Sequence, residues 1–225
     1  MKNRLVLSLV VLPALILLGG CAPQKVRTIF DLAKDGTPQA VKAAIERAKG
    51  ANVNIKESAQ GKTVLMWAAQ FNKDPEVTAV LLKAGAILED KDRDKNWTAL
   101  MWAAQSSKNP EVITTLIKAG ANIKVKDNYG YTPLMIAGEY NENPEVITSL
   151  VSSGADLEAK DQGGFTALMH AASKNRSSDV IIAFLKAGAD PKQKNSKGFT
   201  AIDYAKANRN LDGTDALRQL EDRSK

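Results

Sequence analysis

Four polar side chains alternate with basic ones in EDKDRDKNW, at the spacing of the first ligands of a calcium-binding loop: Asp90, Asp92, Asp94 and Asn96. Such a loop needs glycine at its sixth position and glutamate at its twelfth. The chain has Lys95 and Met101 there, and the interleaved basic residues would repel a cation. We therefore predict no metal site, and we interpret the segment as the tip of a projecting loop.

The only histidine, His170, lacks the neighbours that catalysis or zinc binding requires. Ser173 follows three residues later, but the chain has no second histidine and no HExxH, CxxC or GxSxG motif. It also has no GxxxxGK[ST] or GxGxxG loop for phosphates. Carboxylate pairs for hydrolysis cannot be told from surface acids in the sequence. We predict that the protein is not an enzyme and binds no cofactor.

Three markers recur in fixed order every 34 or 35 residues, which predicts a repeat architecture. A threonine precedes a similar apolar segment five times, at Thr63, Thr98, Thr132, Thr166 and Thr200. Glycine recurs in step, at Gly50, Gly85, Gly120, Gly154 and Gly188. Between them lie DPEV, NPEV, NPEV and SSDV, which begin at Asp74, Asn109, Asn143 and Ser177. The segments Gly50 to Thr63 and Gly85 to Thr98 are one residue longer than the other three.

Each marker has a local physical role. The threonine can cap a helix by accepting a backbone N–H, and Asn109-Pro110-Glu111 combines a cap, a preset φ and a favourable charge at a second helix start. Gly120 then ends that helix in the left-handed region. The polar segment that follows predicts an extended finger. Because helices this short are unstable alone, each pair must stack on its neighbours.

The unit resembles the ankyrin repeat. Thr132-Pro133-Leu134-Met135-Ile136-Ala137 matches the family pattern T-P-L-H-x-A except at the histidine, where each of the four TxLM words has methionine. The histidine usually ties the threonine to the backbone, so this chain must manage without that bond. The resemblance implies an all-α repeat solenoid over residues 28–225, built from helix-turn-helix units with β-hairpin fingers. We expect four full repeats (about 61–95, 96–130, 131–164 and 165–198) between capping helix pairs at 28–60 and 199–225.

The chain begins with Lys2 and Arg4 and a run of fourteen apolar residues, which is too short to span a membrane and predicts a signal peptide over residues 1–20. Leu18-Gly19-Gly20-Cys21 resembles a bacterial lipobox. That resemblance implies lipidation of Cys21, a tether over residues 21–27 and membrane attachment at the cell envelope. The absence of Asp after Cys21 favours the outer membrane, facing the periplasm, in a Gram-negative organism. An ordinary cleaved signal with an incidental cysteine is the alternative.

The net charge of +6 is spread along the chain without a basic run, and Lys2 and Arg4 leave with the signal peptide. This pattern is typical of a mixed solvated surface, so we predict no nucleic-acid partner.

By resemblance to ankyrin proteins, the residue before each threonine and the exposed face of the first helix line a concave surface where protein partners bind. We predict these partner-binding residues on that surface and on the fingers: Trp67, Phe71, Arg93, Trp102, Tyr129, Tyr140, His170 and Tyr204. Aromatic residues of this kind dominate interface energetics. The change of residue type along the array favours exposure of Trp67, Trp102, His170 and Tyr204, although Trp67 and Trp102 could equally pack between repeats. Repetition of aromatic rings before the threonine favours a packing role for Trp97, Tyr131, Phe165 and Phe199.

The sequence therefore predicts a lipid-anchored ankyrin module that binds an unidentified protein in the bacterial envelope. A charge-driven binder of an anionic envelope polymer is one alternative, and an accessory or regulatory subunit of an envelope enzyme is another.

Overall fold

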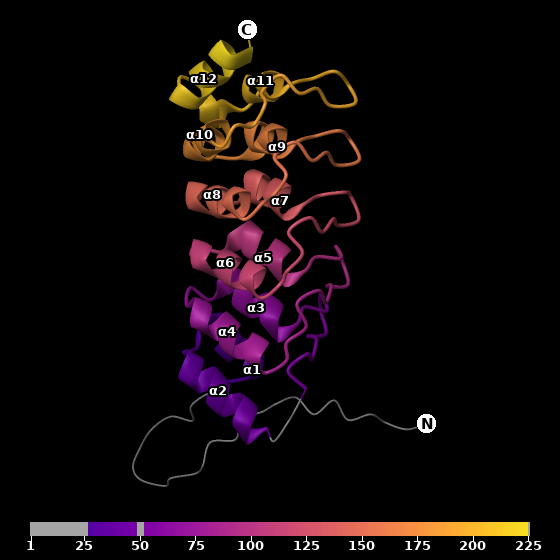
Figure 1. Cartoon of the computed structure of the whole chain (residues 1–225), viewed down its shortest axis with the longest axis vertical. Coiled ribbons are helices and arrows are strands. Elements are labelled where there is room, and N and C mark those ends of the chain that lie inside the picture. The colour runs from indigo at the N-terminus through magenta and orange to yellow at the C-terminus, as the bar shows by residue number, and fades with distance from the viewer. Residues whose placement is uncertain (1–26, 49–51, 225) are drawn as a thin grey trace.

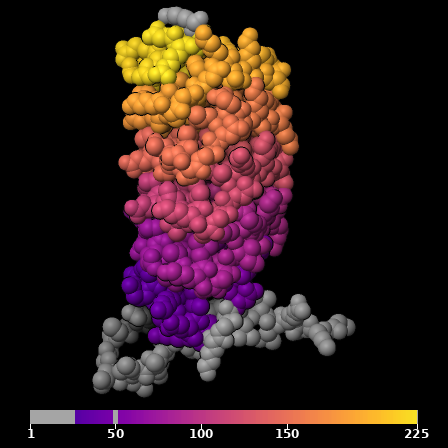
Figure 2. All heavy atoms as spheres, in the orientation of Figure 1, coloured from indigo at the N-terminus to yellow at the C-terminus, as the bar shows by residue number. Residues whose placement is uncertain are grey.

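The computed structural model describes residues 27–48 and 52–224. The predicted signal peptide, Cys21 and the tether before Arg27 lie outside the described residues. In the part of the chain that is described, all regular elements are helices, arranged in two columns with the fingers projecting to one side (Figure 1). Successive repeats stack as bands along the long axis (Figure 2). The predicted all-α repeat solenoid is therefore confirmed.

The two columns contain the first and second helix of each repeat. The inner column, beside the fingers, contains α1 (Ile29–Asp35), α3 (Val64–Phe71), α5 (Ala99–Ser106), α7 (Pro133–Tyr140), α9 (Ala167–Lys174) and α11 (Ala201–Ala205). The outer column contains α2 (Pro38–Arg47), α4 (Pro75–Lys83), α6 (Pro110–Lys118), α8 (Pro144–Ser152), α10 (Ser178–Lys186) and α12 (Asp215–Ser224). A 3-10 turn, η1 (Arg209–Leu211), precedes α12. Four helix pairs thus lie between an opening pair, α1 and α2, and a closing pair, α11 and α12.

The predicted end signals of the helices are largely confirmed. Thr63, Thr132 and Thr166 accept a backbone N–H of their helix, and Asn109 and Asn143 do so for the outer helices. The buried hydroxyl of Thr98 makes no capping hydrogen bond. The side chains of Ser177 and Thr200 make none either, and the Thr200 hydroxyl instead donates to Asp203 Oδ2 at 2.8 Å. Glycines with φ near +90° follow the outer helices, as at Gly120 (φ 101°).

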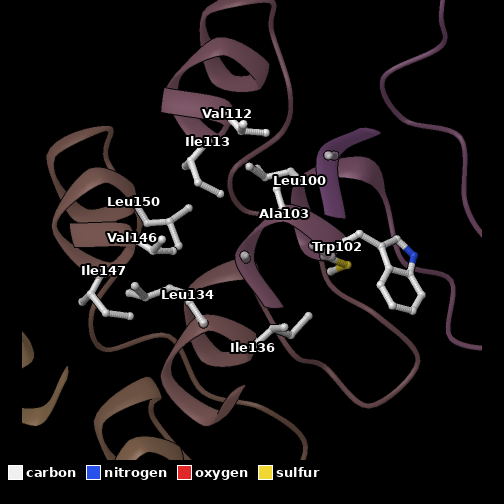
Figure 3. Packing of buried hydrophobic residues seen from close by; sticks show 14 of the residues in the cluster. Leu100, Trp102, Ala103, Val112, Ile113, Leu134, Ile136, Val146, Ile147 and Leu150 are labelled. Atoms are coloured by element: carbon white, nitrogen blue, oxygen red, sulfur yellow. The ribbon is translucent and has the colours of Figure 1, made fainter. Parts of the chain in front are cut away.

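The core lies between the columns and is formed by residues that repeat along the array. Leu100 and Leu134 of the inner helices meet Ile113, Val146 and Leu150 of the outer ones (Figure 3). All are at most 1% exposed. Since each apolar face is covered only by the next helix pair, the stack as a whole, rather than any one repeat, forms the core.

An asparagine that follows four of the inner helices ties neighbouring repeats together: Asn72, Asn141, Asn175 and Asn208. Its side-chain amide donates to two carbonyl oxygens at the end of the preceding inner helix. For Asn175 these are Gly138 O at 2.7 Å and Asn141 O at 2.9 Å. Carbonyls at a helix C-terminus lack intrahelical donors, so the asparagine satisfies them. After α5 the position holds Ser107, whose hydroxyl instead donates to Asn109 O, within its own turn, at 3.0 Å.

The fingers comprise residues 52–62, 86–97, 121–131, 155–165 and 189–199, and we number them one to five. The prediction of β-hairpins was wrong in its detail. Within the described residues the fingers contain no strand, only an isolated antiparallel bridge between Lys56 and Thr63. Each finger is instead a tight turn held by its own side chains, which leaves it free to dock on the inner helices.

Candidate functional site

One polar residue in each of fingers two to five fastens that finger, and we call these residues the finger clamps: Asp92, Asp127, Asp161 and Asn195. The Oδ1 atom of each accepts two backbone N–H groups of its own turn. The other side-chain atom bonds to a ring. Trp102 Nε1 donates to Asp92 Oδ2 at 3.0 Å, and His170 Nε2 lies 2.9 Å from Asp161 Oδ2. The clamps recur at the repeat period, a signal that the sequence contained but that we did not interpret.

The ring that a clamp binds belongs to the inner helix that directly follows the finger in the chain, wherever that helix offers a polar ring. Asn195 Nδ2 donates to the Tyr204 hydroxyl at 2.7 Å. The third repeat has Ile136 at this position, and Trp97 of the preceding finger takes its place, donating from Nε1 to Asp127 Oδ2 at 2.9 Å. The variation from tryptophan to histidine to tyrosine is therefore explained by one structural task.

Glu139, at the end of α7, is the centre of a buried charged network. Its side chain is 1% exposed, with Lys174 Nζ 2.7 Å from Oε1 and His170 Nδ1 3.2 Å from Oε2. Burial alone raises the pKa of Glu139, but hydrogen bonds from His170, Lys174 and Tyr140 outweigh it and lower the pKa to about 2. Burial and the same carboxylate raise the pKa of Tyr140 to about 12. Glu139 therefore stays ionised, and Tyr140 keeps its proton, across the physiological range.

The Glu139→Gln variant should lose less stability in acid than the native protein. A carboxyl whose pKa is lower in the folded chain stabilises the fold above its unfolded pKa, and this contribution is lost as the pH falls through the folded pKa. For Glu139 that window runs from the usual 4.5 down to about 2. We expect the native protein to lose about 2 kcal/mol more than the variant by pH ~3.

Urea unfolding at neutral pH and in acid measures this difference. Glu221→Gln, which changes an exposed carboxyl on α12, should keep the acid sensitivity of the native protein. Equal acid sensitivity of Glu139→Gln and the native protein would show that Glu139 makes no such contribution.

Two lysines lie against the tryptophans of the second repeat. Lys62 Nζ is 3.3 Å from the Trp102 ring centroid and donates to Gln70 Oε1 at 2.9 Å. Burial lowers the pKa of Lys62, and the Asp92 carboxylate partly offsets this effect. On the finger side, Lys95 Nζ lies 4.0 Å from the Trp97 ring centroid. The ring faces here therefore accept ammonium groups at cation–π distance.

Neighbouring fingers are joined by backbone hydrogen bonds, except at one junction. Arg93 N donates to Gln60 O at 2.9 Å, Gln162 N to Tyr129 O at 3.2 Å, and Ser196 N to Gly163 O at 3.1 Å. No such bond joins fingers two and three within the described residues. That junction has side-chain bonds instead, from Asn96 to Asn128 and from Trp97 to Asp127.

We call the contact between fingers two and three, which lacks a backbone hydrogen bond, the open junction. Its cause lies in finger two. Gly61, Gly130 and Gly164 have positive φ, and a Cβ there would lie 3.2 Å or less from the next finger. Finger two has Asn96 at this position, with φ 60°. Its Cβ keeps the next backbone away. In addition, finger two is one residue longer than finger three, so their tips are out of register.

A cavity of about 470 Å³ opens at this junction, and we call it the junction groove. It is lined by Asp94, Lys95, Trp97, Asp127, Tyr129, Tyr131, Glu139, Tyr140, Asp161, Gln162, Gly163 and Lys174. Tyr129 and Tyr140 are 65% and 49% exposed. The groove is thus an aromatic and acidic hollow between projecting fingers and the inner helices.

Comparison with protein families matches ankyrin repeats over residues 29–127, 87–161 and 134–223, which together cover most of the chain. The chain belongs to the ankyrin-repeat family. Comparison with curated proteins found no match. Ankyrin repeats are generally non-enzymatic scaffolds, and they indicate a protein–protein interaction module.

This ankyrin array replaces the family histidine with methionine, and in two repeats the sulfur accepts a backbone bond. Thr63 N–H donates to Met66 Sδ and Thr132 N–H to Met135 Sδ, both at 3.4 Å. In these two repeats the sulfur therefore supplies a tie between the threonine and its helix.

The predicted partner-binding residues of the ankyrin array fall into different environments. Tyr129 and Tyr140 line the junction groove. Trp102 and His170 are each 4% exposed, because the clamps hold their rings inside. The expected exposure of His170 was wrong, and of the two roles left open for Trp102 the structure shows packing. The others lie elsewhere: Trp67 and Tyr204 are half-buried, Phe71 is exposed beside Trp67, and Arg93 is exposed between fingers one and two.

The aromatic residues that directly precede the repeated threonines do not all have the same role. Trp97 is buried as predicted, whereas Phe199 is 48% exposed. Phe165 is half-buried and stacks on His170 at 5.2 Å between ring centroids, and Tyr131 lies 4.5 Å from the same ring. Trp97 and Tyr131 also line the junction groove, so these two residues combine packing with a wall of the site.

No cluster of three or more His, Cys, Asp or Glu side chains that could hold a metal ion occurs in the part of the chain that the structure describes. Of the acidic series in finger two, Asp92 is a finger clamp and Asp94 lines the groove. No helix in residues 27–48 and 52–224 is long and apolar enough to cross a membrane.

Proposed function

We propose that this ankyrin protein is a lipid-anchored adaptor of the bacterial envelope, which binds a protein partner in the junction groove and carries out no chemistry itself. The groove supports this proposal because it places four aromatic rings, Trp97, Tyr129, Tyr131 and Tyr140, around one cavity. Rings of this kind supply most of the binding energy in protein interfaces. Exposed tyrosines are also well suited to this task because they bury a large area at a small cost in conformational entropy.

The rigidity of the surroundings also supports binding there. Clamps fasten fingers two and four to the inner helices and finger three to Trp97 of finger two, and fingers three and four are joined through Gln162 and Tyr129. A preformed surface loses little entropy when a partner binds. The groove is therefore organised before the partner arrives.

The proposed anchor is Cys21, which would hold the array close to the membrane through the short tether. The support is the lipobox-like sequence at residues 18–21. Since stable attachment requires more than one acyl chain, we propose that the mature N-terminus carries several, in the outer membrane facing the periplasm if the organism is Gram-negative. Cys21→Ala should move the protein out of the membrane fraction and abolish palmitate incorporation. Unchanged membrane association would contradict the anchor.

The partner is tested by affinity capture with the full-length protein, solubilised in non-ionic detergent from its own membranes. The Tyr129→Ala, Tyr140→Ala double variant should lose the captured protein, because it removes both exposed rings of the groove. Ile87→Ala, which truncates an exposed apolar residue outside the groove, should retain it. All three proteins must have matched unfolding midpoints. If capture does not depend on Tyr129 and Tyr140 and is lost at moderate salt, the result would instead indicate binding to an anionic polymer.

A further inference from the structure

The charge of the junction groove is opposite to that of the chain. Its lining contains four carboxylates, from Asp94, Asp127, Glu139 and Asp161, against the ammonium groups of Lys95 and Lys174, whereas the whole chain carries +6. The groove is therefore a local acidic site on a basic protein. A partner segment of negative charge would be disfavoured there, and one of positive charge would be favoured.

One wall of the groove already holds a cation from the protein itself. The Lys95 ammonium lies 4.0 Å from the centroid of Trp97, a residue that lines the groove. This contact shows that the face of this largely buried ring accepts a positive group at cation–π distance. Lys95 is on the same finger as Asn96, at the open junction, so its side chain lies where a partner's side chain would compete with it.

The mouth of the groove offers a carboxylate in addition to the rings. Asp94 is exposed and lines the cavity, while Tyr129 and Tyr140 provide apolar ring surface beside it. Arginine and lysine match this arrangement, because their long aliphatic stems pack on rings while their charged ends pair with carboxylates. The cavity, at about 470 Å³, is large enough for such a side chain.

We propose that the junction groove binds a basic segment of the partner protein, with an arginine or lysine side chain inserted between the aromatic walls and paired with Asp94. This inference rests on the proposed function as a protein-binding module and adds the chemical class of the partner. The net positive charge of the chain cannot produce such binding, so attraction of a basic peptide must come from the groove.

The test measures binding of a fluorescent glycine–serine peptide that contains arginines to the full-length protein in non-ionic detergent at low salt. Matched peptides carry glutamine or glutamate in place of every arginine. We expect the arginine peptide to bind and the other two to bind at least about fivefold more weakly. Equal binding of the arginine and glutamine peptides would overturn the proposal.

Two pairs of variants locate the binding. Asp94→Asn should weaken binding of the arginine peptide about fivefold. Glu221→Gln, which removes an exposed carboxylate on α12, should leave that binding unchanged. Lys95→Gln should strengthen binding by removing the competing ammonium, whereas Lys83→Gln on α4 should not. If the distant variants change binding as much as the groove variants, the attraction is not local and the proposal fails.

The two proposals can fail separately. If the arginine peptide does not bind but capture of an envelope protein still depends on Tyr129 and Tyr140, the adaptor function stands and only the basic character of the partner is wrong. If neither the peptide nor any envelope protein depends on groove residues, the proposed function fails with it.

Discussion

Replacing Asn175 by alanine should lower the free energy of unfolding by about 3 kcal/mol, because two hydrogen bonds between repeats are lost in a buried site. Asn175 is 2% exposed, donates to Gly138 O and Asn141 O, and accepts from Ser177 N. Alanine would leave those three backbone groups without these partners. Urea unfolding followed by circular dichroism measures the loss.

The converse change provides the control. Ser107 occupies the same position after α5 and bonds within its own turn, so Ser107→Asn should restore the missing tie to the end of α3 and add about 1 kcal/mol. A neutral result for Asn175→Ala would show that the asparagine ties do not hold the repeats together.

Gly138→Ala should destabilise the protein by about 2 to 3 kcal/mol through overpacking. The inner helices of the other full repeats have alanine at this position: Ala69, Ala104 and Ala172. At Gly138 a Cβ would lie 2.8 Å from the Ala167 carbonyl oxygen and 3.2 Å from the Phe184 ring. Phe184 in turn stands where the outer helices of the other full repeats have leucine, at Leu81, Leu116 and Leu150, so glycine at position 138 leaves room for the larger ring.

A double-mutant cycle tests this compensation. In the Phe184→Leu background the repeat has the same pair of residues as its neighbours, and we expect Gly138→Ala to cost about 1 to 2 kcal/mol less there than in the native protein. Calorimetric or urea unfolding of the four proteins gives the coupling. Additive effects would mean that the two residues adapted independently.

The sequence predicted the solenoid because its signals are local. Each signal acts within one turn of helix: threonine starts the first helix of a repeat, asparagine-proline starts the second helix, and glycine ends it. The repetition of these signals at a fixed period indicated the family. The sequence also showed that methionine replaces the family histidine, although the sulfur bonds to Thr63 and Thr132 were not foreseen.

The site was harder to predict because it depends on contacts between repeats. The change of residue type along the array favoured exposure of His170 and left both packing and binding open for Trp102, but Asp92 and Asp161 bind the two rings from the fingers. The groove likewise depends on a long finger beside a short one and on Asn96 in place of glycine. The sequence showed the difference in finger length, but only the structure showed that the backbone bonds stop there.

Site-specific photo-cross-linking in living cells tests the central claim most directly, because it asks which surface touches a partner in the envelope. A photoreactive phenylalanine analogue would replace Tyr140, in the groove, and separately Ile182, which lies on the outer helix α10 and lines a different hollow. Our account predicts a discrete cross-linked protein from position 140 and none from position 182. A product from position 182 alone would place the binding surface on the outer helices and contradict it.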